Sequence, residues 1–510
     1  MNRLFQDYKS GVANFIERFG AVVFLTALLC AFFLTCIPFL FTEKMGSDEA
    51  LYAWCAQQIA HRPSMIFSAL ALEFHPPLFP ALLALGKIAL PFPDDISFRF
   101  MSLSLSLLGI FLIYRLGVRL AGRFVGCFCA LILAFNYNYL LSATEIMSDS
   151  LVFVLFLSRI SVKSSLLQHL FVGIIASMIF LAKISSVIII PFVGIYYLYL
   201  FRHEDIRMKL KVLIPVGVTG AFSFGYFLFR ALRFSEIVPN SDLLVSGGVR
   251  PFSFWYYILN IHNLLIYPFL VPLFLFGIYY LATTQYRYRF LILSHMAILI
   301  LLISIPPLKY MRYTLIVMPS IMMVAAIGLN ELPKRFIKKQ RQLVLFKVFS
   351  IIIGCVVITA FYPRMVERLS ISFSTSTGLA EAGQWIKSNT DPDTLVISQN
   401  LRPTRYYSGI EERRFGGWLV LLPLQKVDFE KLLKEFPQRI LLQVDLWNES
   451  NPSDFSPFWR PEREEEYFRK NGFILVKIVR RKVYSQENLE GAVVPVVKIY
   501  ERPQGRLNNE

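Results

Sequence analysis

The chain has 510 residues, of which 55% are hydrophobic and 17% are charged, and its mean hydropathy is +0.53. This composition excludes an ordinary soluble domain and indicates an integral membrane protein. The formal net charge is +17, but the residues after Tyr362 hold only 22 of the 52 Lys and Arg residues and 20 of the 35 Asp and Glu residues. The positive surplus therefore lies in the hydrophobic part, where membrane topology explains it better than binding to nucleic acid.

The first apolar segment covers residues 19–42 and contains no charged residue. It is long enough to cross a bilayer, and it is too long for a secretory signal peptide. Basic residues precede it, which predicts a cytoplasmic N-terminus. These residues are Arg3, Lys9 and Arg18. The chain that follows is then expected on the outer side of the membrane.

A polar stretch, residues 46–78, follows this span. Ser47 can serve as an N-cap, with Asp48 and Glu49 in the first turn of a helix whose apolar residues recur at helical spacing up to Ile59. This pattern predicts a helix on the membrane surface, with its acidic start beside the lipid headgroups. In the alternative interpretation, the two carboxylates only complement the positive end of the helix dipole.

The apolar segments predict about eleven membrane spans in all, with the clusters of basic residues at their cytoplasmic ends. Besides residues 19–42, the predicted spans cover residues 97–114, 125–141, 151–158, 166–182, 185–201, 212–229, 262–282, 290–305, 313–329 and 343–362. The short segment 80–90 is interpreted as an embedded or re-entrant part of the first outer loop. Residues 144–149 and 234–261 form further outer loops on this path.

After Pro363 the composition becomes that of a soluble domain. Helical patterns at residues 379–387, 429–436 and 464–470 alternate with strand patterns at 394–398, 439–444, 473–479 and 493–500. Such alternation predicts a small α/β domain. The expected domains are therefore a membrane domain, residues 1–363, and an extracytoplasmic α/β domain, residues 364–510. Two roles remain open for the second domain, guidance of an acceptor and a structural cap.

The predicted topology gathers ionisable residues of both signs at the outer helix ends. They are Asp48, Glu49, His75, Glu145, Asp149, Lys183, Lys309 and Arg312. Ionisable groups near a bilayer are costly, so such a group on one side predicts a site. Its carboxylates are suited to remove a proton from a hydroxyl, and its cations are suited to hold a phosphate.

Each of these residues also has a structural interpretation. Asp149 can cap the short helix that follows it, and the lysines and Arg312 can extend to the membrane interface. His75 can be a loop residue restrained by Pro76 and Pro77. Their placement together on one side carries more information than any single residue.

Five segments resemble, in order, the membrane part of the GT-C glycosyltransferases. They read SDEALYA, HPPLFPALLALGKIAL, RFMSLSLSLLGIFLIYRLGVRLAGRFVG, SATEIMSDSLVFVLF and KYMRYTLIVMPSIMMVAAIGL. The resemblance covers roughly residues 15–365. It is nearest to the branch that holds the dolichyl-phosphate-mannose protein mannosyltransferases and the bacterial lipid A aminoarabinose transferases. The fold that it implies is a polytopic α-helical membrane protein with a C-terminal α/β domain.

The resemblance implies an enzyme of the plasma (inner) membrane that moves a hexose or pentose from a polyprenyl-phosphate donor to an acceptor hydroxyl on the outer face, with inversion. The acceptor can be a lipid such as lipid A, a protein or a glycan. By position, Asp48 matches the general base, Glu49 its supporting neighbour and Asp149 the acid of the second loop. Cationic and aromatic positions near the carrier phosphate are matched by Lys183, Lys309, Arg312 and Tyr313.

Two departures qualify this resemblance. His75 stands where the aminoarabinose transferases have Lys before Pro-Pro, and the HPPL sequence is similar to the mannosyltransferase version. The WWDYG-type signature is absent from the sequence, and the paired DxD acids of oligosaccharyltransferases are absent from its membrane part. This absence argues against metal-dependent transfer of a large glycan to asparagine. Participation of a divalent metal ion otherwise stays open.

Two other classes of protein compete with the enzyme. A transporter or lipid flippase also has many spans, but its ionisable residues are expected near the midplane, on broken helices related by an internal repeat. A sensor would use the C-terminal domain to bind a ligand, and it leaves the charged outer residues unexplained.

Overall fold

The computed structural model describes residues 2–67, 77–146, 270–286, 288–304, 314–315, 317–374, 376–411, 418–421, 426–436, 438–445, 461–484 and 491–503, with short stretches between 174 and 229. These residues form two compact units. The membrane unit holds Met1–Leu40 and the described residues from Ile59 to Tyr362. The C-terminal unit holds Phe41–Gln58 together with the described residues from Pro363 onward.

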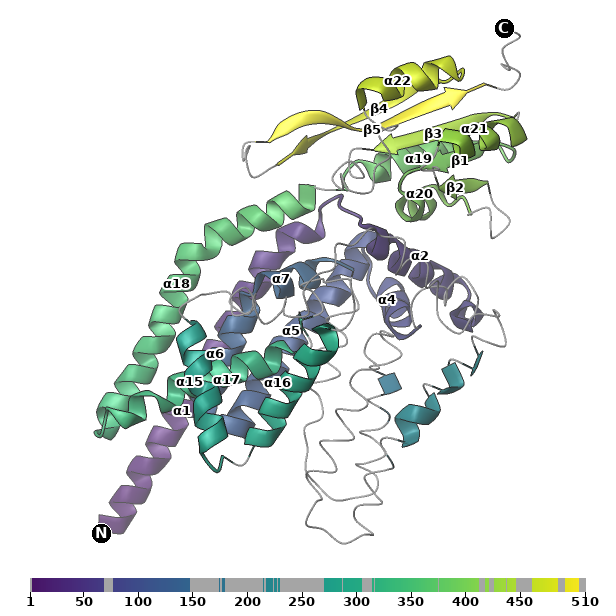
Figure 1. Ribbon diagram of the computed structural model, residues 1–510. Coiled ribbons are helices and arrows are strands. Elements are labelled where there is room, and N and C mark those ends of the chain that lie inside the picture. The colour runs from purple at the N-terminus through teal and green to yellow at the C-terminus, as the bar shows by residue number, and fades with distance from the viewer. Residues whose placement is uncertain are drawn as a thin grey trace. The chain divides into compact units, whose positions relative to one another are not determined.

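Helices make up the described part of the chain before residue 379 (Figure 1). They are α1 (Asn2–Leu40), α2 (Ser47–His61), η1 (Pro63–Phe67), α4 (Leu78–Ala89), α5 (Asp94–Ala121), α6 (Arg123–Ala134), α7 (Tyr137–Thr144), α15 (Leu270–Thr283), α16 (Arg289–Ser304), α17 (Met318–Glu331), η4 (Pro333–Arg335) and α18 (Gln340–Ser374).

Three of the described helices are long and apolar enough to cross a membrane. They are α1 over Phe19–Leu40, α5 and α18, and α6 with α7 makes a fourth if the bent pair is one span. Helices of sufficient length therefore lie where membrane spans are predicted at residues 19–42 and 97–114. The spans predicted between residues 151 and 201 lie outside the described residues, apart from a few helical positions.

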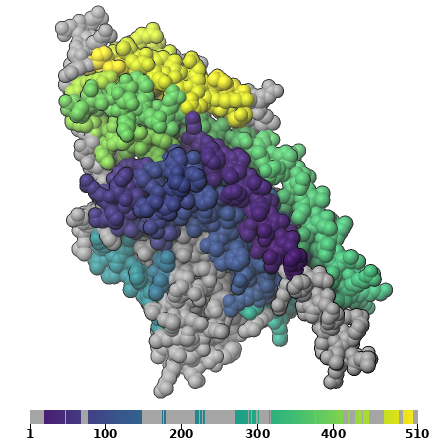
Figure 2. All heavy atoms as spheres, turned by 180° about the vertical axis from the view of Figure 1, so that it is seen from behind, coloured from purple at the N-terminus to yellow at the C-terminus, as the bar shows by residue number. Residues whose placement is uncertain are grey.

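Exposed apolar side chains mark the surface of these helices. Along α18, large hydrophobic residues from Val344 to Phe361 are exposed, including Phe349 at 60% and Val356 at 62%. Figure 2 shows green spheres of this helix at the surface. A continuous exposed apolar face is the surface that a helix presents to lipid, so it agrees with an integral membrane protein.

The helix predicted over residues 125–141 is in fact broken. α6 ends at Ala134 and α7 begins at Tyr137, and the two are bent by 64°. Asn136 between them has an extended backbone, and its side chain accepts a hydrogen bond from the backbone N–H of Tyr139 at 3.2 Å. The hydrophobic pattern continues through this point, but Asn136 caps a new helix and stops the old one.

The helices α15 and α17 of the membrane unit approach each other closely at two glycines. A Cβ atom on Gly277 of α15 would collide with the carbonyl oxygen of Val324 of α17, and one on Gly328 would collide with that of Leu273. Small residues let membrane helices pack backbone against backbone. The start of α5 is fixed differently, because buried Arg99 donates a hydrogen bond to the carbonyl oxygen of Leu40 at the end of α1, at 3.2 Å.

The α/β domain, defined here as Leu379–Arg502, contains a five-stranded sheet. Its elements are α19 (Leu379–Asn389), β1 (Leu395–Ser398), α20 (Leu401–Ser408), β2 (Leu419–Leu421), α21 (Lys426–Glu435), β3 (Ile440–Asp445), α22 (Pro461–Lys470), β4 (Ile474–Val483) and β5 (Ala492–Arg502). The strand order is β2-β1-β3-β5-β4. The strands β2, β1 and β3 run parallel, and β5 is antiparallel to both β3 and β4.

Successive residues of the central strands point to opposite faces of this sheet. Leu395 and Ile397 of β1 pack in a cluster with Phe429 of α21 and Phe468 of α22. Val396 joins the cluster of α19 on the other face. Figure 1 shows α19 and α20 on one side of the sheet and α22 on the other. The strands β1 and β3 are buried over their full length, as expected for strands with helices on both faces of the sheet.

Three elements differ from the predictions. The helix α20 and the strand β2 were not predicted, because α20 reads LRPTRYYS without an apolar period and β2 has only three residues. The last predicted membrane helix ends at Tyr362, but α18 continues through Pro363 to Ser374. Its final turns are polar, so hydrophobicity alone does not show that the helix goes on.

Candidate functional site

The start of α2 uses one of its two adjacent carboxylates for its own structure. The backbone N–H of Ala50 donates to the carbonyl oxygen of Gly46 at 2.9 Å, so Gly46 holds the N-cap position instead of Ser47. The Glu49 carboxylate accepts a hydrogen bond from the backbone N–H of Gly46 at 2.8 Å and is only 1% exposed. This is the returning half of a capping box. The structural interpretation of the acidic pair therefore applies to Glu49.

The Asp48 carboxylate is directed to a different element. Arg402, in the first turn of α20, donates from Nη1 to Oδ1 of Asp48 at 3.1 Å. The Asp48 side chain keeps 30% of its surface exposed, and that of Arg402 keeps 19%. A partly exposed carboxylate that accepts a hydrogen bond from a guanidinium is oriented by it, and it is still accessible to a hydroxyl that must lose a proton.

A second arginine of α20 packs on α2. The guanidinium carbon of Arg405 lies 4.0 Å from the ring centroid of Trp54. Arg405 is 1% exposed and Trp54 is 3% exposed, so the cation–π contact is desolvated. Residues 50–56 of α2 are all at most 3% exposed. This part of α2 is therefore covered by protein neighbours such as Arg405 on all its faces, and its position along a membrane surface stays a prediction.

Hydrogen bonds at the carboxyl ends of β1 and β3 fix the beginning of α20. The Thr404 hydroxyl donates to Oε1 of Gln443 at 2.9 Å, and it has only one hydrogen. Ser398 must therefore donate to Thr404 across their 2.8 Å hydroxyl contact. Ser398 in turn accepts from the backbone N–H of Asn400 at 3.1 Å, and Asn400 donates its side-chain amide to Asp445 at 2.7 Å. These buried bonds join the sheet to the first turns of α20.

The loop before α2 is bound to other parts of the same unit. Arg481 of β4 makes two hydrogen bonds to the Glu43 carboxylate, at 2.7 and 3.1 Å. Lys44 is 7% exposed, donates to the Ser372 hydroxyl at 3.1 Å and lies 4.9 Å from the centre of the Phe373 ring. The hydrogen bond to Glu43 is the largest contribution that raises the pKa of Arg481. The segment before Asp48 is therefore anchored by charged contacts at two neighbouring residues.

The predicted site residues are only partly within the described part of the chain. Asp48 and Glu49 are described, as is Glu145, which is 8% exposed at the end of α7. The remaining predicted residues lie outside the described residues: His75, Asp149, Lys183, Lys309, Arg312 and Tyr313. Among the residues that are described, no three His, Cys, Asp or Glu side chains form a group that could hold a metal ion.

The sequence did not single out three residues of α2 and α20 that make these contacts. Trp54 was assigned only to the apolar face of a surface helix, and Arg402 and Arg405 were not singled out. One available signal was the pair of arginines three residues apart in LRPTR, directly after a buried strand. Residues at this spacing share one helix face. Their partner could not be read from that signal, since Arg402 and Asp48 are 354 residues apart.

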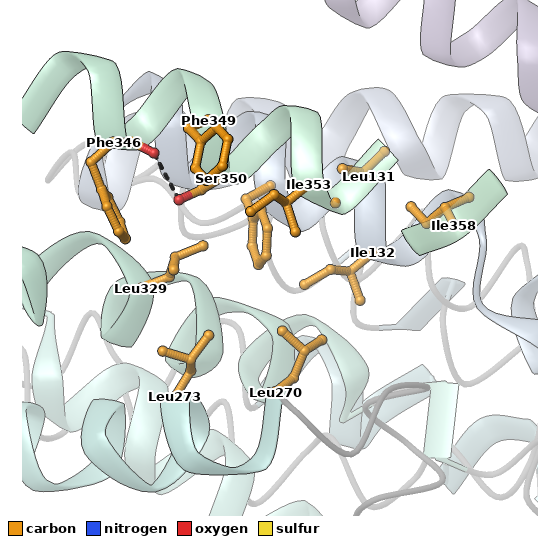
Figure 3. A pocket seen from close by; sticks show the side chains of 12 residues that line it. Leu131, Ile132, Leu270, Leu273, Leu329, Phe346, Phe349, Ser350, Ile353 and Ile358 are labelled. Carbon is orange, nitrogen blue, oxygen red and sulfur yellow. Dashed lines mark hydrogen bonds between the residues drawn. The ribbon is translucent and has the colours of Figure 1, made fainter. Parts of the chain in front are cut away.

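The membrane unit contains an apolar cavity of about 260 Å³ among α6, α15, α17 and α18 (Figure 3). Its lining residues are Phe128, Leu131, Ile132, Leu270, Leu273, Leu329, Phe346, Phe349, Ser350, Ile353, Gly354 and Ile358. The hydroxyl of Ser350 donates to the carbonyl oxygen of Phe346 at 2.8 Å. The cavity therefore offers no titratable side chain, and its surface is suited to hydrocarbon rather than to acid–base chemistry.

Comparisons with known proteins identify the fold. No family model matches the sequence, and neither does any curated protein. ArnT from Cupriavidus metallidurans, solved with undecaprenyl phosphate, is similar with a TM-score of 0.59 at 12% identity, over 96% of this chain and 99% of ArnT. The archaeal oligosaccharyltransferase AglB from Archaeoglobus fulgidus, solved with an inhibitory peptide and a dolichol-phosphate, gives 0.60 at 12% identity, over 94% of this chain and 74% of AglB.

A third similar structure is the arabinofuranosyltransferase AftD from Mycobacteria. Its TM-score is 0.57 at 13% identity, over 97% of this chain and 40% of the longer AftD chain. Identities at this level show a common fold and leave the activity of this chain to be argued separately. All three similar proteins are GT-C glycosyltransferases. The fold suggested by the ordered sequence segments is thus confirmed, and the chain is a helical membrane protein with the GT-C fold.

Proposed function

We propose that this protein is a membrane glycosyltransferase that moves a sugar from a polyprenyl-phosphate donor to an acceptor hydroxyl, with Asp48 as the general base. The proposal rests on the position, exposure and partner of the Asp48 carboxylate. This carboxylate follows the first membrane span, keeps 30% of its side chain exposed and is paired with Arg402 at 3.1 Å. The fold is that of ArnT and AglB, which were solved with undecaprenyl phosphate and with a dolichol-phosphate.

The proposed reaction is one displacement at the anomeric carbon. The acceptor oxygen attacks this carbon while Asp48 takes the hydroxyl proton, and the bond from the carbon to the phosphate oxygen breaks. The configuration is inverted because no enzyme-bound sugar intermediate forms. Help from a positioned base accounts for about 100- to 10,000-fold in rate, or about 3–5 kcal/mol of barrier. The proton then passes from Asp48 to water.

The leaving polyprenyl phosphate gains one negative charge as this bond breaks. The proposal assigns neutralisation of that charge to Lys183 and Arg312, with contributions from His75, Lys309 and Tyr313. Fixed cations at a leaving group stabilise the transition state where its charge develops. Asp149 is assigned to orient the sugar or the acceptor, and Glu49 to support Asp48 by holding the start of α2.

The proposed site faces the side of the membrane opposite the cytoplasm. The basic residues before the first span and in the inner loops support a cytoplasmic N-terminus and an extracytoplasmic C-terminal unit in the plasma (inner) membrane. This placement suits the reaction, because the hydrocarbon chain of the carrier stays in the bilayer while its phosphate reaches the outer loops. The apolar cavity of the membrane unit is compatible with a hydrocarbon chain in the same way.

Transfer by the purified full-length protein tests the proposal. Polyprenyl phosphates that carry different radiolabelled sugars are incubated with the protein in nanodiscs and with extracted membrane lipids, glycans and proteins. Radiolabel is expected to become covalently attached to one acceptor class. Asp48→Asn is expected to lower turnover at least about 100-fold, while binding of polyprenyl phosphate stays within about twofold.

Asp391→Asn is the matched control, because Asp391 pairs with Arg439 at the same 3.1 Å but is 75% exposed at the edge of the α/β domain. This variant should retain transfer within about twofold. Normal turnover by Asp48→Asn would show that the base is assigned wrongly. An absence of covalent transfer with every donor would overturn the proposed function.

One described feature favours a transporter. The bent pair α6 and α7 is a broken helix, as transporters use around a substrate. The polar residue at that break, Asn136, caps α7 through its own side chain. Its role there is to stabilise the start of the helix. Movement of labelled lipid across the membrane without a new covalent bond would establish this second function instead.

A further inference from the structure

We propose that α20 is a positioning element for the proposed reaction and that Arg402 orients the Asp48 carboxylate. The inference rests on the proposed role of Asp48 and assigns a function to the α/β domain. Arg402 is a positioning residue, because it contacts the base at 3.1 Å and is not assigned to substrate. Its action differs from that of the cations that the proposed function places at the carrier phosphate.

The position of Arg402 is determined by the sheet. Asn400 and Thr404 flank it in the chain, and both are hydrogen-bonded to side chains of β3, namely Asp445 at 2.7 Å and Gln443 at 2.9 Å. The strand β3 lies next to β1 in the sheet, and β1 leads directly into α20. A side chain between two such contacts comes from a rigid backbone, as a group that must orient a reacting carboxylate requires.

Arg405 and Trp54 fix α2 against the same helix. A guanidinium over an indole ring, with both side chains almost fully buried, resists sliding of one helix along the other. Arg405 follows Arg402 by one helical turn, so the two contacts hold α2 at two points. Asp48 is therefore restrained both at its carboxylate and through the helix that carries it.

An arginine beside a general base has an electrostatic cost. Its positive charge stabilises a negative carboxylate, and this stabilisation is lost when Asp48 takes the proton of the acceptor. The Arg402–Asp48 pair speeds the reaction only if orienting the base raises the rate by more than this electrostatic cost lowers it. Displacement of a reacting group by about 1 Å can cost about 100-fold in rate. The proposal therefore predicts that loss of Arg402 lowers kcat, because a displaced base is a poorer catalyst even without a positive charge beside it.

The test compares Arg402→Ala with Arg402→Lys in the full-length protein and the radiolabel assay. Arg402→Ala is expected to lower kcat about 10- to 100-fold, with KM for the polyprenyl donor within about twofold. Arg402→Lys should recover part of that loss, and so should millimolar guanidinium added to Arg402→Ala. A kcat unchanged in Arg402→Ala, or a loss that neither lysine nor guanidinium reduces, would overturn the proposal.

Arg439→Ala is the matched control for a purely structural lesion. Arg439 bonds to Glu501 at 2.7 Å and to Asp391 at 3.1 Å in the same unit. It should lower thermal stability at least as much as Arg402→Ala does and leave kcat within about twofold. Equal losses of kcat in both alanine variants would show that Arg402 acts only through stability, and would overturn the proposal.

Two further measurements separate this inference from the proposed function. If Asp48→Asn loses transfer and Arg402→Ala keeps it, only the inference fails. If Asp48→Asn keeps transfer, the base assignment fails and the inference fails with it. Hydrogen exchange of residues 47–58 tests the restraint without any turnover. Exchange is expected to be at least about tenfold faster in Arg402→Ala and unchanged in Arg439→Ala; equal exchange in both would overturn the proposal.

Discussion

Two aspartate–arginine pairs in the C-terminal unit have the same length but different settings. Asp48 and Arg402 lie 3.1 Å apart and link the start of α2 to α20. Asp391 and Arg439 are also 3.1 Å apart, and Arg439 has a second partner in Glu501 of β5. Asp391 is 75% exposed, whereas Asp48 is 30% exposed in the first turn of α2, a helix whose next residues are buried. The length of an ion pair therefore says little about its role, which depends on what else its carboxylate can reach.

Charge reversal gives the largest expected contrast between the two regions. Arg402→Glu should lower sugar transfer more than about 100-fold, because a like charge beside Asp48 both repels it and removes its orienting partner. Arg439→Glu should leave transfer within about twofold and lower only the melting temperature. The radiolabel assay and a thermal melt of both variants check this contrast. Similar transfer in the two variants would remove the distinction between the regions.

Truncation of Trp54 is expected to have the next largest effect. Trp54→Ala removes a buried ring from beneath Arg405, and such truncations cost about 3–5 kcal/mol. Trp54→Phe keeps an aromatic face for the guanidinium and should recover more than half of that loss. Chemical denaturation monitored by hydrogen exchange in α2 measures both variants. Equal destabilisation by alanine and phenylalanine would mean that the ring face contributes nothing.

Substitutions of Glu49 test whether its role differs from that of its neighbour Asp48. Glu49→Gln keeps an oxygen that can accept the Gly46 N–H but loses the charge at the helix start, so about 0.5 kcal/mol of stability should be lost. Glu49→Ala also leaves that N–H without its partner and should cost about 1–3 kcal/mol. Both should reduce transfer less than Asp48→Asn does. Parallel melts and radiolabel assays test the ranking, which a larger transfer loss in Glu49→Gln would reverse.

The smallest expected effect is a dependence of stability on pH at Glu381. Hydrogen bonds from Lys477 and Arg481 lower the pKa of Glu381 below its ordinary value of 4.5. A lowered folded-state pKa means that these bonds stabilise the protein above the unfolded pKa and that the stabilisation is lost as pH falls through the folded pKa. Because Glu381 is 39% exposed, solvent screens the effect.

Melting temperatures measured from about pH 6 to about pH 3 test this effect. Wild type should be more stable than Glu381→Gln at the higher pH, and the two should converge as pH falls. A constant difference across that range would show that the carboxylate charge is not involved.

Much of the fold could be predicted from the sequence because the periodic segments are long or buried on both faces. Residues 19–42 and the strands β1 and β3 are of this kind, and the structure has each of them close to its predicted place. The break at Asn136 was missed because apolar residues continue on both sides of it. A single capping side chain there outweighs the hydrophobic pattern.

The candidate site was less predictable. The carboxylate pair at residues 48–49 could be recognised by its place after the first span, but the two residues differ in ways that spacing does not reveal. Which one caps the helix depends on the backbone at Gly46, and which one meets Arg402 depends on tertiary packing. Contacts between residues far apart in the chain leave no local pattern in a single sequence.

The grouping of Phe41–Gln58 with the residues after Tyr362 has a practical consequence for domain exchange. A chimera that replaced only the residues after Tyr362 with those of another enzyme would separate Asp48 from Arg402 and Trp54 from Arg405. A chimera that replaced Phe41–Gln58 together with the residues after Tyr362 would carry both partners of each contact. Modular engineering of this protein therefore needs two splice points near the N-terminus as well as the one in α18.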